Sequence, residues 1–79
     1  MSASSQSLPA RIYFFITRQG PRWNVAVDHN VPVSFGDRDS AIQAALSGAR
    51  KIWEEFHHVT GVRIQDDYGG WRALRTFGA

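Results

Sequence analysis

Few side chains in this 79-residue chain have the types and spacing that metal chemistry requires. His57 and His58 are adjacent, and His29 lies far from them in the sequence. Adjacent residues of a helix project about 100° apart, so His57 and His58 are poorly placed to chelate one ion together. There is no cysteine for a thiolate site or a disulfide. We therefore expect no metal site, and we interpret the two adjacent histidines as the end of a helix, where imidazolium meets the negative end of the dipole.

Asp66 and Asp67 form the most evident carboxylate pair. They precede glycines in a stretch typical of a turn, where aspartate side chains accept hydrogen bonds from the local backbone. Gly69-Gly70 connects two predicted strands and leads into no helix, so it does not have the context of a phosphate loop. The chain also contains no Gly-x-Ser-x-Gly motif. These patterns predict a protein that is not an enzyme and uses no cofactor or small-molecule substrate.

Aromatic side chains and arginines are interleaved in two stretches, RIYFFITR at residues 11–18 and WRALRTF at residues 71–77. Sheet-surface aromatics that stack bases are one way in which proteins bind single-stranded RNA. In that interpretation the nucleic-acid contacts would come from Arg11, Arg18, Arg72 and Arg75. The alternative is that Tyr13 and Phe15 are packed within the protein. A net charge of only +2 does not favour nucleic acid.

The element that must organise these residues is an amphipathic helix from Asp37 to about His57. Its apolar residues recur at steps of three and four, which places them on one helical face: Ile42, Ala45, Leu46, Ala49, Ile52, Trp53 and Phe56. Asp37 is the expected N-cap, with a capping box of Ser40 and Gln43 as the rival start. Gly61 is the expected left-handed stop.

Alternation of apolar and polar residues predicts strands on both sides of this helix. The first strand is apolar on both faces, as in the centre of a sheet, whereas Pro32 assigns the third strand to an edge. His29-Asn30 is a candidate hairpin turn. In the last strand, period-two alternation groups Leu74 with Arg72 and Thr76, opposite Trp71, Ala73 and Phe77. The predicted strands are residues 11–18, 22–28, 31–35, 62–65 and 71–77.

The predicted fold class is α+β: a curved antiparallel sheet in the order βββαββ, with one amphipathic helix packed on one face. If all neighbours are antiparallel, the expected strand order is 3-2-1-5-4. Residues 11–79 would form a single domain, and residues 1–10, which are rich in serine, a flexible tail. The start lacks the pattern of a signal peptide, and no apolar run approaches membrane-spanning length, so we expect a cytoplasmic protein.

Several short motifs resemble a known family. They are Trp23-x-Val25, Phe35-x-Asp37 with Ala41-Ile42, Ala49-Arg50, the turn Asp66-Asp67-x-Gly69, and Thr76-Phe77-Gly78. Together they are similar to the small bacterial and phage domain-of-unknown-function family numbered 2188, over residues 11–78. The chain departs from that pattern at Leu74, where the family is usually polar, and at Asp37, where Thr is commoner. The resemblance implies the architecture and no activity.

One helix can cover only one face of a small sheet. The first and last strands would then expose apolar side chains on the other face, namely Tyr13, Phe15 and Leu74. Monomers rarely leave such a patch in water. We therefore expect a small homodimerising interaction or regulatory module that buries this candidate interface, with a nucleic-acid-binding module as the alternative.

Overall fold

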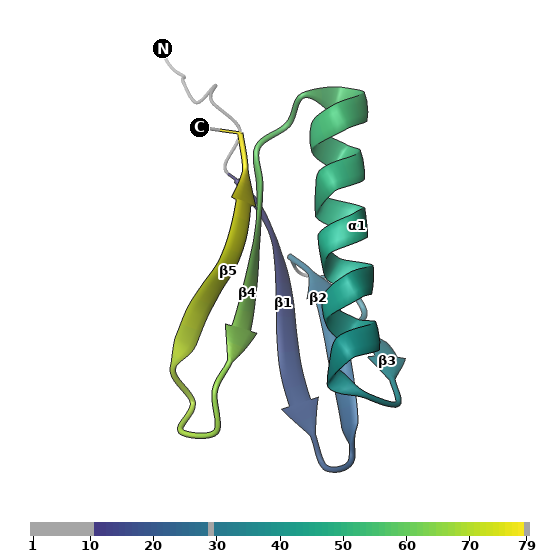
Figure 1. The fold of residues 1–79 in the computed structure, drawn as a ribbon, viewed down its shortest axis with the longest axis vertical. Coiled ribbons are helices and arrows are strands. Elements are labelled where there is room, and N and C mark those ends of the chain that lie inside the picture. Colours follow the sequence, from purple (N-terminus) through teal and green to yellow (C-terminus); the bar gives the residue numbers. More distant parts are fainter. Residues whose placement is uncertain (1–10, 29, 79) are drawn as a thin grey trace.

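The computed structural model describes residues 11–28 and 30–78. The elements follow the predicted order βββαββ (Figure 1). They are β1 (Ile12–Gln19), β2 (Arg22–Val27), β3 (Val33–Phe35), α1 (Arg38–Phe56), β4 (Thr60–Gln65) and β5 (Trp71–Phe77). The fold is α+β, a five-stranded sheet with one helix packed on it, which confirms the predicted class. The predicted tail at residues 1–10 and the predicted turn residue His29 lie outside the described residues.

The sheet is mixed and has the strand order β3-β2-β1-β4-β5. β1 lies in the centre, antiparallel to β2 and parallel to β4, whereas β4 and β5 pair antiparallel. The predictions of a wholly antiparallel sheet and of the order 3-2-1-5-4 are therefore wrong. The cause is the long connection: a 19-residue helix spans about 28 Å. It carries the chain back along the sheet, so that β4 starts at the same end as β1.

The start and the end of α1 agree with the sequence prediction, and only the predicted stop residue does not. Asp37 is the N-cap, and its Oδ1 accepts a hydrogen bond from the Ser40 backbone N–H at 2.8 Å. The Ser40 hydroxyl donates to Oδ2 at 3.0 Å, so Ser40 supports this cap and does not form a rival one. The helix ends at His57, whose φ of 53° is left-handed. Gly61, the predicted stop, lies inside β4.

The helix packs on the sheet through small side chains. Ala41, Ala45 and Ala49 are buried in one row along α1. Gly48 permits further close approach, because a Cβ there would lie 2.7 Å from Cε2 of Phe14. The predicted apolar stripe is confirmed from Ile42 to Ile52, whereas Trp53 does not belong to the core cluster and Phe56 is 73% exposed. The sheet contributes the larger buried apolar side chains to the core, namely Phe14, Ile16, Val25, Val62 and Ile64.

A β-bulge changes which residues of β5 face the helix. The register pairs Val62 with Arg75 and Arg63 with Ala73, so Leu74 is an additional residue in β5. Leu74 packs against the core, and its predicted place on the uncovered face is wrong. Phe77 also packs against the core, whereas the predicted alternation put Leu74 and Phe77 on opposite faces.

Within the described residues, no helix is long and apolar enough to cross a membrane.

Candidate interaction surfaces

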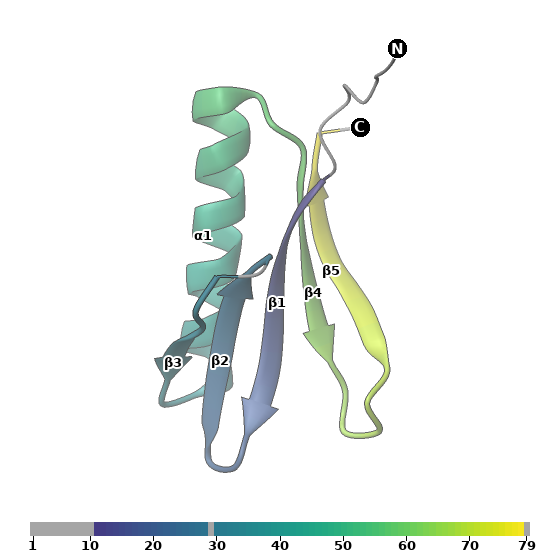
Figure 2. The same ribbon diagram turned by 180° about the vertical axis from the view of Figure 1, so that it is seen from behind.

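The side of the sheet away from α1, shown in Figure 2, has no layer of the described chain covering it. Three aromatic rings meet there across the parallel pair of β1 and β4 and the neighbouring β5. The centroids of Tyr13 and Phe15 are 5.7 Å apart, and those of Phe15 and Trp71 are 5.3 Å apart in an edge-to-face arrangement. We call Tyr13, Phe15 and Trp71 the aromatic cluster. Trp71 is its most accessible member and is 47% exposed.

Tyr13 is held from two sides. Its ring lies against Gly61, its register partner on β4, where a Cβ would come within 2.8 Å of Tyr13 Cε1. The guanidinium carbon of Arg63 lies 4.3 Å from the ring centroid, and Nη2 of Arg63 donates to the Tyr13 hydroxyl at 3.2 Å. Arg63 therefore fixes both the face and the polar end of this ring.

Arg11 lies beside the same ring, and its hydrogen bonds go to the backbone. Its Nη1 donates to the carbonyl of Thr60 at 2.8 Å, and more weakly to those of Phe77 and Gly78. Arg11 therefore ties the start of β1 to the end of β5. Both arginines near the aromatic cluster have partners within the protein.

The other arginines proposed for nucleic-acid binding do not join Arg11. Arg72 pairs with Ile64 and Arg75 with Val62, both core residues, so these two arginines lie on the helix side of the sheet. Arg18 pairs with Trp23, which also packs against the core, and its Nε donates to the Gly20 carbonyl at 3.2 Å. The structure therefore does not assemble the four predicted contacts on one surface.

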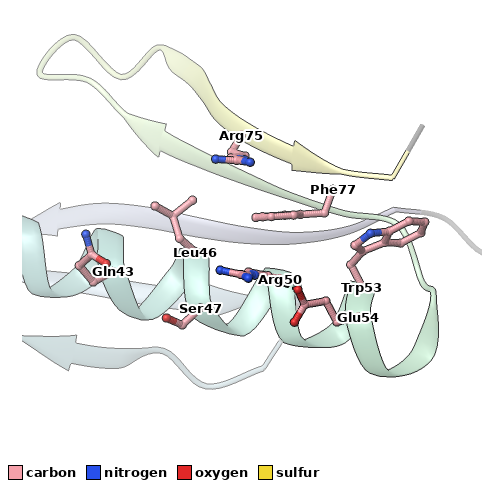
Figure 3. A pocket seen from close by; sticks show the side chains of 8 residues that line it. All are labelled: Gln43, Leu46, Ser47, Arg50, Trp53, Glu54, Arg75 and Phe77. Carbon is pink, nitrogen blue, oxygen red and sulfur yellow. Dashed lines mark hydrogen bonds and ion pairs between the residues drawn. The ribbon is translucent and has the colours of Figure 1, made fainter.

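A second surface is a groove between α1 and β5, shown in Figure 3. It has a volume of about 600 Å³. Leu46 and Trp53 line it from the helix and Phe77 from β5, and the polar side chains of Arg50 and Arg75 lie among them. The ion pair of Arg50 and Glu54, 2.9 Å long, lies on the helix side of this groove.

The residues considered for catalysis or metal binding have local roles. Asp66 accepts hydrogen bonds from the backbone N–H of Tyr68 at 2.9 Å and of Gly70 at 2.8 Å, as expected for a turn. The His57 ring packs edge-to-face on Trp53, and the Nδ1 of His58 lies 3.1 Å from the Val59 carbonyl. In residues 11–28 and 30–78, no three His, Asp or Glu side chains come close enough to hold a metal ion.

Two residues of the uncovered face were missed by the sequence interpretation, Trp71 and Arg63. Trp71 was assigned to the helix side because period-two alternation grouped it with Phe77, and the bulge at Leu74 breaks that alternation. Arg63 had a usable signal: it alternates with Val62 and Ile64, so it had to face away from the core.

Comparison with known proteins finds no match to a family model, a curated protein or a solved structure. The resemblance to the domain-of-unknown-function family numbered 2188 therefore stays a prediction.

Proposed function

We propose that this protein is a small, non-enzymatic interaction module that forms a homodimer by burying the uncovered sheet face. The observation that carries this proposal is the aromatic cluster, whose outermost member, Trp71, is about half exposed. Aromatic residues and arginine are the types enriched in protein interfaces, and Trp, Tyr and Arg dominate their binding energy. This face offers all three types side by side.

Because the apolar core is small, burial of further apolar surface in a dimer would stabilise the domain. Among the described residues, three of the eight buried apolar ones are alanines, which contribute little apolar area. A domain of this size buries only about 60% of its unfolded surface and is correspondingly marginal. Each large side chain transferred into an interface contributes roughly 1.5–3 kcal/mol before association entropy is subtracted.

The charges of the face are compatible with self-association. Arg63 is stacked on Tyr13, and Arg11 is hydrogen-bonded to backbone carbonyls. Asp28 lies at the same end of β1, where its Oδ1 accepts from the Tyr13 N–H at 3.1 Å. In a symmetric dimer the same patch of each copy faces that of the other. Each copy can therefore offer the two arginines and the Asp28 carboxylate to its partner.

Sedimentation equilibrium tests the proposal. We expect a dimer at a concentration of about 100 µM that persists as the salt concentration is raised, because apolar contacts are not weakened by screening. Phe15→Arg should convert it to a monomer, whereas Arg18→Glu, a change on the other side of the sheet, should leave it dimeric. A wild-type monomer at that concentration would contradict the proposal.

The second candidate is a module that binds single-stranded nucleic acid on the same face. The favouring observation is that the Arg63 guanidinium and three aromatic rings lie together, a combination that stacks bases. Titration with a fluorescent oligonucleotide separates the two candidates. Nucleic-acid binding would weaken steeply with salt, would be abolished by Arg63→Glu, and would accompany a monomeric protein.

A further inference from the structure

The helix-bearing side of the sheet is only partly covered. α1 packs mainly on β1, β4 and β2, the middle of the sheet, and less on the edge strands β3 and β5 (Figures 1 and 2). Five strands spaced about 4.8 Å apart are roughly twice as wide as one helix, which measures about 10–12 Å. The groove between α1 and β5 lies in the space that remains.

Three of the side chains that line the groove are apolar, and the others are polar or charged. Leu46 packs against the core from α1, and so does Phe77 from β5. Trp53 closes one end, where a Cβ on Gly78 would lie 2.8 Å from its Cζ3. Figure 3 shows Leu46, Phe77 and Trp53 in sequence along the groove. The apolar groups therefore form a line parallel to α1, as the anchoring residues of a docked helix require.

Arg75 gives the groove a positive charge that no neighbouring carboxylate among the described residues neutralises. Its guanidinium carbon lies 5.1 Å from the centroid of the Phe77 ring. The neighbouring carboxylate, Glu54, is paired with Arg50 at 2.9 Å. Over the described part of the chain, no carboxylate lies within ion-pair distance of Arg75. The groove thus offers a cation beside an apolar surface.

We infer that this groove binds an acidic amphipathic helix of a partner protein. The helix would lie on β5 beside α1, giving the sheet a second helix on the same face. Its apolar residues, spaced three and four apart, would contact Leu46, Phe77 and Trp53, and a carboxylate on its flank would pair with Arg75. The inference is independent of the proposed homodimer, because it uses the opposite side of the sheet.

The three tryptophans can report where the peptide binds, because each lies in a different part of the structure. Trp53 lines the groove, Trp71 belongs to the aromatic cluster, and Trp23 packs near β3. The probe is an amidated, acetylated peptide of about 14 residues with Leu at helical spacing and Glu elsewhere. We expect it to shift the indole N–H resonance of Trp53 in a ¹⁵N-labelled sample and to leave that of Trp71 unchanged.

Two matched controls test the role of charge. A peptide with Lys in place of Glu should bind roughly tenfold more weakly to the wild type, and Arg75→Glu should reverse the preference between the two peptides. Arg22→Glu, which changes the same charge on the other side of the sheet, should not alter the preference. Absence of binding at about 1 mM peptide, shifts centred on Trp71, or an unchanged preference in Arg75→Glu would each overturn the inference.

Discussion

The ring of Tyr13 lies directly against Gly61 of the neighbouring strand, where any larger residue would displace it. The two residues are register partners in the parallel pair of β1 and β4. A Cβ on residue 61 would lie 2.8 Å from Cε1 and 3.0 Å from Cδ1 of Tyr13, well inside van der Waals contact. Gly61 thus sets how deeply Tyr13 sits on the uncovered face, and with it the ring on which Arg63 stacks.

Gly61→Ala is therefore expected to destabilise the domain and to disturb the aromatic cluster. Overpacking of this kind typically costs 1–3 kcal/mol, here because the Tyr13 ring must move off its place beneath Arg63. Thermal denaturation and the chemical shifts of the Tyr13 ring protons measure the two effects. Gly36→Ala is the control, since apart from its chain neighbours no heavy atom lies within 4 Å of the Cβ it would add. Equal effects of the two substitutions would show that the contact does not matter.

The buried hydroxyl of Thr60 links the sheet to the helix, which yields a second prediction. Thr60 is fully buried, and its Oγ1 donates to the Ala49 carbonyl at 2.9 Å. Thr60→Val keeps the shape of the side chain and removes this bond, so it should cost about 1 kcal/mol and lower the melting temperature by about 4–8 °C. Thr76→Val, at an exposed position of β5, should change it little. An unchanged melting temperature in Thr60→Val would contradict the role of this bond.

Those parts of the fold that depend on local chemistry were predictable from the sequence. Asp37 begins the helix because its carboxylate satisfies free backbone N–H groups, and that pattern needs no knowledge of the rest of the chain. The apolar residues on both sides of β1 correctly indicated a central strand, and Pro32 an edge position for the strand beside it. In each case the signal and its structural cause lie within a few residues of each other.

The errors arose where the outcome depends on distant parts of the chain. Alternation shows which residues share a face and carries no information about strand direction, so the parallel pairing of β1 and β4 was missed. One additional residue at Leu74 puts the residues before it on the opposite faces from those that alternation from Phe77 predicts, and the bulge is set by pairing with β4. Gly61 was taken as a helix stop because its actual partner, Tyr13, lies 48 residues earlier in the sequence (61 minus 13), and a local pattern cannot show so distant a contact.

The helix cap provides a pH-dependent prediction. Hydrogen bonds from the backbone and side chain of Ser40 lower the pKa of Asp37 below its ordinary value. A carboxyl group whose pKa is lower in the folded state stabilises the protein above its unfolded pKa, and that contribution is lost as the pH falls through the folded value. The wild type should therefore lose stability below about pH 4.

Asp37→Asn isolates this contribution. Asparagine is also a good N-cap, so the variant should retain the helix at neutral pH. Its amide does not titrate, so the difference in melting temperature between wild type and variant should shrink as the pH falls below about 4. Circular dichroism at several pH values measures the difference. A difference that stays constant with pH would show that Asp37 titrates alike in the folded and unfolded states.

The bulge in β5 allows dimer formation and core stability to be separated by two substitutions three residues apart in the sequence. Trp71 lies on the uncovered face and is about half exposed, whereas Leu74 packs against the core. If the proposed dimer forms through the aromatic cluster, Trp71→Ala should weaken dimerisation by 2 kcal/mol or more, about 30-fold, with a small effect on the monomer. Leu74→Ala should instead lower the free energy of unfolding, by about 2 kcal/mol since the site is only partly buried, and should leave the dimerisation constant unchanged.

Sedimentation equilibrium and chemical denaturation of both variants measure the two quantities. The opposite result, with Leu74→Ala breaking the dimer and Trp71→Ala destabilising the fold, would restore the simple alternation of β5 and contradict the bulge.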